Sequence, residues 1–121
     1  MIKTRESDTL KAVIDFLESQ NIFYERVNPV SLVGHSHNGF RCRKLRESQK
    51  GAPDIRIYSG NGRVVFVEVK SEIGKLSLYQ ERWKARAEEM GIQYFVVRKI
   101  GDLLEILKDL TGQERSQRKL E

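Results

Sequence analysis

Two runs of alternating apolar and polar residues flank a Gly-Asn-Gly triplet in the middle of the chain, and this pattern constrains the fold more than any other. The runs are residues 54–58 and 63–70, and the triplet is Gly60-Asn61-Gly62. Period-two alternation is typical of half-buried strands, and glycine and asparagine favour the tight turns that join antiparallel strands. The segment therefore predicts a β-hairpin.

The length of the hairpin loop decides which residues face each other. A three-residue loop centred on the asparagine pairs Ser59 with Arg63, and the same register places Asp54 directly opposite Glu68. A two-residue Asn-Gly loop would shift this register by one. In the first register Lys70 lies on the same strand face as Glu68. The apolar residues of both strands then share the other face, which we expect to pack against a helix: Ile55, Ile57, Val65, Val67 and Val69.

Periodic patterns on both sides of the hairpin predict the other elements. In chain order these are a helix over residues 7–20 capped by Ser7 or Thr4, a strand over 22–27, a basic loop from 28 to 50 with a possible strand at 40–43, a helix from 77 to about 90, a strand over 93–98 and a helix over 102–110. This order predicts an α/β fold with a small mixed central sheet of about four to five strands, including the hairpin, flanked by helices. The crossover from Lys70 to Gln93 should be parallel and right-handed.

The second predicted helix carries two distinct signals. Ser77 and Gln80 form a capping box, which explains both residues without any further role. Tyr79, Trp83, Ala87 and Met90 lie on one stripe. The two aromatic residues could stack on nucleic-acid bases, but their helical spacing favours a place in the core.

Composition limits the class of protein. A chain of 121 residues suits one compact domain, and we assign residues 1–112 to it and 113–121 to a frayed polar tail. No apolar run is long enough to span a bilayer and the N-terminus is charged, so we expect a cytoplasmic protein without a membrane partner. The net charge of +5 favours a polyanionic partner such as DNA.

Cys42 is the single cysteine, so a thiolate zinc cluster is excluded and any metal must use carboxylate, amide or imidazole ligands. Oxygen ligands favour Mg²⁺ or Mn²⁺. His35 and His37 lack a suitable third ligand, and we expect them to be solvated or to face DNA. We expect no organic cofactor.

Asp54, Glu68 and Lys70 form a combination that can cleave a phosphodiester. Two carboxylates on adjacent strands can hold the cation that neutralises charge at phosphorus, and a lysine can orient and acidify the attacking water. The alternative is that Glu68 and Lys70 are only the charged face of an amphipathic strand.

Basic residues close to Asp54 are the candidate DNA contacts, although such runs are usually solvated surface. They are Arg41, Arg43, Lys44, Arg46 and Lys50 before it in the chain, and Lys75 after it.

Three short motifs together resemble the virus-type replication-repair nuclease (VRR-NUC) domain, a branch of the PD-(D/E)XK nucleases. They are Gly51-Ala52-Pro53-Asp54, Glu68-Val69-Lys70, and Gly74-Lys75-Leu76-Ser77 leading to Gln80. The resemblance runs from the first helix to about Leu107. It implies a restriction-endonuclease-like core.

The resemblance also implies roles for individual residues. It implies metal ligands at Asp54, Glu68 and the backbone carbonyl of Val69, with Lys70 as the catalytic lysine. It further implies a supporting catalytic role for Gln80. An acid on the first helix completes the metal site, and we assign it to Glu6, with Asp8 as the alternative position.

For the whole chain, the resemblance implies a Mg²⁺- or Mn²⁺-dependent DNA endonuclease that leaves 5′-phosphate and 3′-hydroxyl ends. It suggests a homodimer that cuts branched DNA such as Holliday junctions. Two other hypotheses stay open. One is a non-catalytic DNA-binding module of the same fold, and the other is a sequence-specific restriction-type endonuclease.

Overall fold

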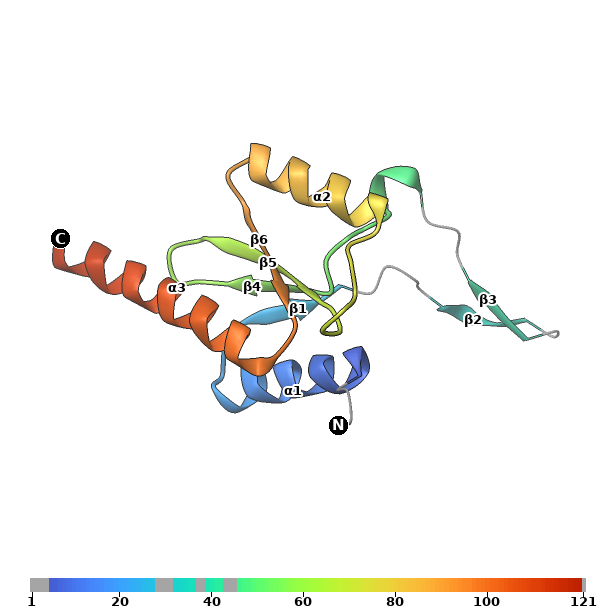
Figure 1. Ribbon diagram of the computed structural model, residues 1–121, viewed down its shortest axis with the longest axis horizontal. Coiled ribbons are helices and arrows are strands. Elements are labelled where there is room, and N and C mark those ends of the chain that lie inside the picture. Colours follow the sequence, from blue (N-terminus) through green and yellow to red (C-terminus); the bar gives the residue numbers. More distant parts are fainter. Residues whose placement is uncertain (1–4, 28–31, 37–38, 43–45, 121) are drawn as a thin grey trace.

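A mixed β-sheet forms the centre of the molecule (Figure 1). The computed structural model describes residues 5–27, 32–36, 39–42 and 46–120. The sheet has four strands in the order β1 (Tyr24–Arg26), β4 (Ile55–Tyr58), β5 (Val64–Val69) and β6 (Gln93–Val97). The pairs β1–β4 and β4–β5 are antiparallel, whereas β5 and β6 are parallel. The predicted mixed α/β fold and the parallel crossover are therefore confirmed.

The hairpin of β4 and β5 adopts the three-residue loop and its register. Ile55 pairs with Val67 and Tyr58 pairs with Val64. The loop closes where the backbone N–H of Ser59 donates to the carbonyl of Arg63 at 2.8 Å. Continuing this register by one residue puts Asp54 beside Glu68. The two acids therefore come from adjacent strands at one end of the sheet, as the sequence predicted.

Helices cover both faces of the sheet (Figure 1). The helices α1 (Glu6–Ser19) and α3 (Ile100–Leu120) lie on one face, and α2 (Leu78–Glu89) lies on the other. The main core fills the space between the sheet and the helices α1 and α3, and it contains the five predicted apolar residues of the hairpin. Its buried members are Val13, Leu17, Ile55, Ile57, Val65, Val67, Val69, Val97, Leu103, Ile106 and Leu110.

On the α2 face, packing is less apolar than the sequence predicted. Ala87 is buried, and the Trp83 ring lies 6.5 Å from the Phe66 ring of β5. Met90, however, is 71% exposed and does not belong to the core. The helix ends at Glu89, just before Met90, because Gly91 takes a left-handed conformation with φ of 79°.

The ends of the other helices also differ from the prediction. Arg5 is the N-cap residue of α1 and makes no side-chain cap, whereas Ser7 lies inside the helix; Thr4 lies outside the described residues. At the other terminus α3 continues past the predicted end at Leu110 to Leu120. One glycine in a helix costs only about 1 kcal/mol, and the glutamine, glutamate, arginine and lysine residues after Gly112 are good helix formers. None of the helices in the described ranges is both long and apolar enough to cross a membrane.

A second, two-stranded sheet lies apart from the main one (Figure 1). Its strands are β2 (Leu32–Ser36) and β3 (Gly39–Cys42). β3 corresponds to the possible strand predicted at 40–43, but β2 falls in a segment predicted to be a loop. A short 3₁₀ helix, η1 (Glu47–Gln49), then leads to the main sheet.

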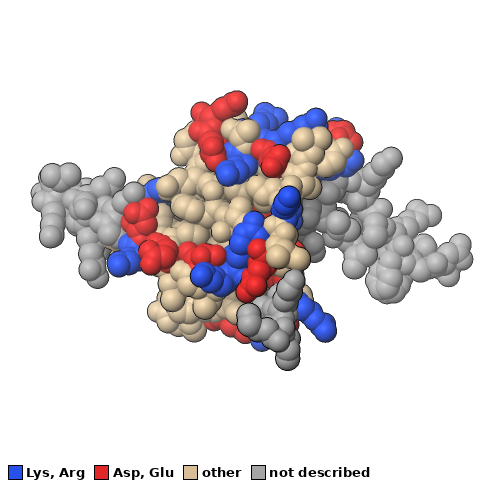
Figure 2. Space-filling view, viewed as in Figure 1, with Lys and Arg blue, Asp and Glu red and all other residues tan. Residues whose placement is uncertain are grey.

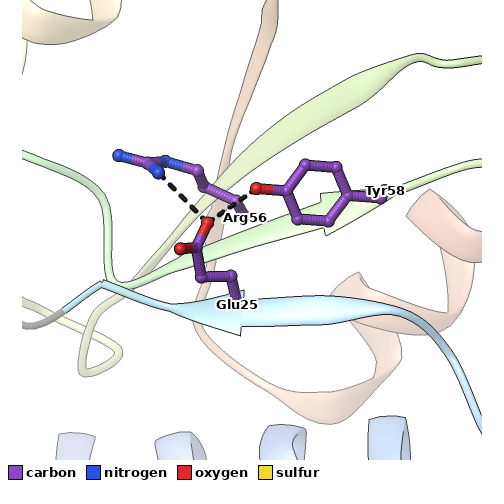
Figure 3. A network of polar contacts seen from close by, with 3 residues as sticks. All are labelled: Glu25, Arg56 and Tyr58. Carbon is purple, nitrogen blue, oxygen red and sulfur yellow. Dashed lines mark hydrogen bonds and ion pairs between the residues drawn. The ribbon is translucent and has the colours of Figure 1, made fainter.

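A polar network ties the edge strand β1 to β4. Figure 3 shows Arg56 and Tyr58 of β4 reaching toward the Glu25 carboxylate of β1. The same oxygen accepts from the Arg56 guanidinium at 3.1 Å and from the Tyr58 hydroxyl at 2.6 Å. This network holds the short edge strand, and with it the strand that begins directly after Asp54.

Gly51 fits closely against the start of α2 and offers a test of this packing. Its φ is +86°, and a Cβ there would overlap the backbone carbonyl of Tyr79. Gly51→Ala should therefore lower the free energy of unfolding in urea by more than about 3 kcal/mol. Gly62→Ala is the matched control, since its φ of +74° is similar but nothing lies within 4 Å. It should cost only about 1 kcal/mol. Equal losses would contradict the close packing of Gly51.

Candidate active site

Three carboxylates from separate elements converge at one end of the sheet. Glu6 begins α1, Asp54 precedes β4, and Glu68 lies in β5. One carboxylate oxygen from each lies within 4.8 Å of the other two. Asp8 does not belong to this group, so the structure brings Glu6, and not the alternative acid, to the two hairpin acids.

Asp54 is fixed through both its backbone and its side chain. Its carbonyl accepts from the N–H of Val27 at 2.8 Å, and its Oδ2 accepts from the N–H of Val69 at 2.8 Å. Pro53 beside it is fully buried. These contacts leave little freedom at Asp54. They also bring it against the backbone of Val69, the residue whose carbonyl was predicted as a further ligand.

Glu68 is the most perturbed acid of the group. It is only 2% exposed, and burial together with the charge of Asp54 raises its pKa to about 8, while Lys70 opposes this shift. Its Oε1 accepts from the Gln80 amide at 3.0 Å, whereas Oε2 is buried without a hydrogen-bond partner among the described residues. A buried carboxylate with a free oxygen beside two other acids suits a divalent cation, because hard cations take oxygen ligands.

Gln80 serves the helix and the site at the same time. Its Oε1 accepts from the N–H of Ser77 at 2.8 Å, and its own N–H donates to the Ser77 hydroxyl at 3.2 Å. This is the predicted capping box. The amide nitrogen left over is the group that donates to Glu68. Capping therefore places Gln80 and does not compete with its contact at the site.

Lys70 is half-buried directly after β5, and its charge reaches Glu68. The backbone N–H of Lys70 donates to the carbonyl of Val97 at 3.0 Å, which continues the pairing of β5 with β6. The aliphatic part of its side chain passes close to Gly74. The lysine thus lies at the same end of the sheet as the three acids.

The predicted DNA contacts are only partly described. Arg43 and Lys44 lie outside the described residues, as does the side chain of Arg41. Arg46 and Lys75 are exposed. Lys50 pairs with Glu47 at 2.8 Å and lies 5.0 Å from the centre of the Tyr79 ring. Of the two histidines, His35 lies in β2, and His37 is outside the described residues.

A groove of about 240 Å³ continues from Lys50 along α2, and its lining includes Tyr79, Arg82 and Arg86. Figure 2 shows acidic and basic side chains interspersed on the viewed face, with Lys and Arg side chains over α2 and the segment next to it. Basic side chains of the described residues therefore also lie along this helix, beyond the predicted basic run, although acidic side chains are interspersed with them.

Sequence patterns missed two residues beside the site. The Arg98 guanidinium donates to the carbonyls of Ser71 at 2.7 Å and Gly74 at 2.6 Å, and so holds the loop after Lys70. Tyr94 in β6 is buried, and burial and the charge of Glu68 raise its pKa. Both lie in or next to the strand predicted at 93–98. Their roles depend on pairing with β5, which strand periodicity alone does not reveal.

The model of the VRR-NUC domain family matches residues 4–99, which include all three acids and Lys70. The chain belongs to the VRR-NUC family. A solved structure described as a VRR_NUC domain is similar in fold, with a TM-score of 0.60 and 24% sequence identity, over 87% of this chain and 96% of the other. Comparison with curated proteins found no match. VRR-NUC domains are nucleases of the PD-(D/E)XK superfamily, whose substrate is DNA and which usually need a divalent metal ion.

The raised pKa of Glu68 in this VRR-NUC domain predicts a pH-dependent stability. The folded chain keeps the Glu68 proton up to about pH 8, whereas the unfolded chain releases it near the ordinary value of 4.5. Between these values the unfolded state binds fewer protons, so stability falls as pH rises, by at most about 1.4 kcal/mol per pH unit. In chelator, Glu68→Gln should therefore flatten the dependence of the melting temperature on pH between 5 and 8.

Glu25→Gln is the control for this measurement, because the Glu25 pKa is lowered and not raised. It should leave the decline toward pH 8 in place. A wild-type melting temperature that rises steadily from pH 5 to pH 8 would contradict the assignment of a buried, protonated Glu68.

Proposed function

We propose that this VRR-NUC domain is a Mg²⁺- or Mn²⁺-dependent DNA endonuclease with its active site at Glu6, Asp54, Glu68 and Lys70. The convergence of the three carboxylates beside Lys70 supports the proposal most directly. A DNA-binding module would gain nothing from acids at this place, because they repel the phosphates. The acids are also costly to the fold, since one of them is buried. Catalysis gives both features a purpose.

Each side chain has a distinct task in this proposal. The three carboxylates would hold the cation, with the Val69 carbonyl as a further ligand. When bound, the cation neutralises the charge that develops on the phosphate during attack. Gln80 holds Glu68 in place through its amide. Asp54 is held through its contact with the Val69 N–H.

Lys70 acts on the attacking water in this proposal. Its ammonium group orients the water and favours loss of a proton from it. The water oxygen bonds to phosphorus and releases a proton to solvent, the bond from phosphorus to O3′ breaks, and the departing O3′ takes up a proton from solvent. The products carry 5′-phosphate and 3′-hydroxyl ends.

DNA binding would use the basic residues predicted from the sequence, of which Arg46 and Lys75 are exposed and Lys50 is half-buried. Arg46, Lys50 and Lys75 are the described members of the predicted set, and we propose the same role for Arg41, Arg43 and Lys44. Such residues contact phosphates and therefore carry no base sequence information. Selectivity would then come from DNA shape, which fits branched DNA better than a fixed cleavage sequence.

We further propose a homodimer that acts on four-way junctions. One active site cuts one strand, so symmetrical cleavage of a junction requires two sites. A dimer with twofold symmetry supplies them in matching orientation.

Substitutions in the site provide the first test. Lys70→Ala and Asp54→Asn should each slow nicking of labelled DNA in Mg²⁺ or Mn²⁺ by about a hundredfold or more. The first substitution removes the ammonium group that orients the attacking water, and the second removes a ligand of the metal ion. DNA binding, measured by fluorescence anisotropy in Ca²⁺, should persist. Lys11→Ala and Asp15→Asn are matched controls, since these residues form an exposed ion pair on α1. Full activity of Lys70→Ala and Asp54→Asn, or absence of nicking by the wild type, would contradict the assignment of the protein as a nuclease.

A panel of DNA substrates tests the narrower claim. Four-way junctions should be cut at least about tenfold faster than duplex, single-stranded, flap or splayed DNA of the same sequence. Light scattering should give the mass of a dimer. Equal rates on all substrates would remove the junction assignment but leave the nuclease intact. Mapping the cuts in random sequence distinguishes the third hypothesis, because a restriction-type enzyme would cut at one fixed motif.

A further inference from the structure

Tyr94 brings a buried hydroxyl to the acid cluster. It lies in β6, where it pairs with Phe66, and Glu68 is the next residue of β5 on the same face. The Tyr94 side chain is only 7% exposed. Its hydroxyl has no hydrogen-bond partner within the described part of the chain, and the same holds for Oε2 of Glu68. Two buried polar atoms without partners therefore belong to neighbouring residues on one face of the sheet.

A buried hydroxyl without a partner lowers the stability of a folded protein, and native structures contain few of them. Phenylalanine would fill the same space without this cost. The rest of the α2 face shows that an apolar ring is tolerated there, since Phe66 occupies the paired position on β5. The hydroxyl is therefore not explained by packing, which points to a state in which it has a partner.

The surroundings indicate which partner that is. Glu68 and Asp54 are the acidic groups close enough to act on the Tyr94 hydroxyl. A tyrosine hydroxyl carries its proton near neutral pH, so it can donate to an ionised carboxylate, which is the form of Glu68 that a cation would bind. Oε1 of Glu68 already accepts from Gln80, which leaves Oε2 as the available acceptor.

We propose that the Tyr94 hydroxyl is a positioning donor for Glu68, which, together with Gln80, holds the Glu68 carboxylate in the orientation that binds the divalent cation. This inference rests on the proposed metal-dependent function of the site. Tyr94 touches neither the cation nor the DNA in this account. It acts through Glu68, in the way that groups behind a metal ligand commonly set its orientation.

Tyr94→Phe removes only the hydroxyl and gives two readouts. Mn²⁺ binding to the DNA-free protein, measured by isothermal titration calorimetry, should weaken about tenfold, which is typical for loss of a group behind a ligand. The melting temperature in chelator should stay equal or rise, because the substitution removes a buried polar atom without a partner. This combination is opposite to that of a structural tyrosine, whose loss lowers the melting temperature.

Two further variants make the result decisive. Tyr24→Phe removes a tyrosine hydroxyl that donates to Glu18 at 2.7 Å on the surface, and it should bind Mn²⁺ as the wild type does. Asp54→Ala should lose Mn²⁺ binding, which tests the metal site itself. Wild-type Mn²⁺ affinity in Tyr94→Phe, or a lower melting temperature in chelator, would overturn the role of Tyr94 while Asp54→Ala still upholds the metal site. Unchanged binding in Asp54→Ala would instead overturn the proposed site, and the role of Tyr94 with it.

Discussion

The burial of Glu68 between two fully buried valines is the constraint on which the rest of the site depends. Val67 and Val69 have no exposed surface and point into the core below the sheet. A slip of β5 by one residue would turn both valines away from the core, so the register is strongly fixed. The carboxylate between them must then face α2 and the other acids. Apolar packing on one face of the strand thus holds a carboxyl group that is costly to bury on the other.

Contacts from other elements convert this fixed position into a site. Asp54 accepts a hydrogen bond from the residue after Glu68, so the two acids move together with the hairpin. Gln80 connects Glu68 to the first turn of α2. Arg98 holds the loop that follows Lys70. Each of these groups also serves local structure, since it lies at a strand end, in a helix cap or in a loop. This double use allows a chain of 121 residues to bring so many polar groups together.

Local signals in the sequence were sufficient for the parts that depend on neighbours in the chain. The Gly-Asn-Gly turn predicted the hairpin and limited its register to two alternatives, of which the structure adopts the three-residue loop, and Ser77 with Gln80 predicted the start of α2. Local signals were insufficient where a tertiary contact fixes the role of a residue, or where small differences in helix propensity decide where a helix ends. The amide of Gln80 could be assigned to Glu68 only once α2 lay over β5. The end of α3 depended on one glycine against several good helix formers. Tyr94 looked like an ordinary strand residue, because its importance comes from the neighbouring strand.

The clustering of three carboxylates limits the stability of the folded chain unless a proton or a cation is bound. The acids at the end of the sheet repel one another, and protonation of Glu68 relieves this repulsion when no cation is present. A divalent cation would relieve it in a different way, by replacing the proton with a charge that all three carboxylates share. Ligand binding to the folded state alone adds to stability. Protons and cations are therefore expected to compete for the same carboxylates. The core formed by β4, β5, α1 and α3 supplies the stability that keeps the chain folded both with the protonated cluster and with a bound cation.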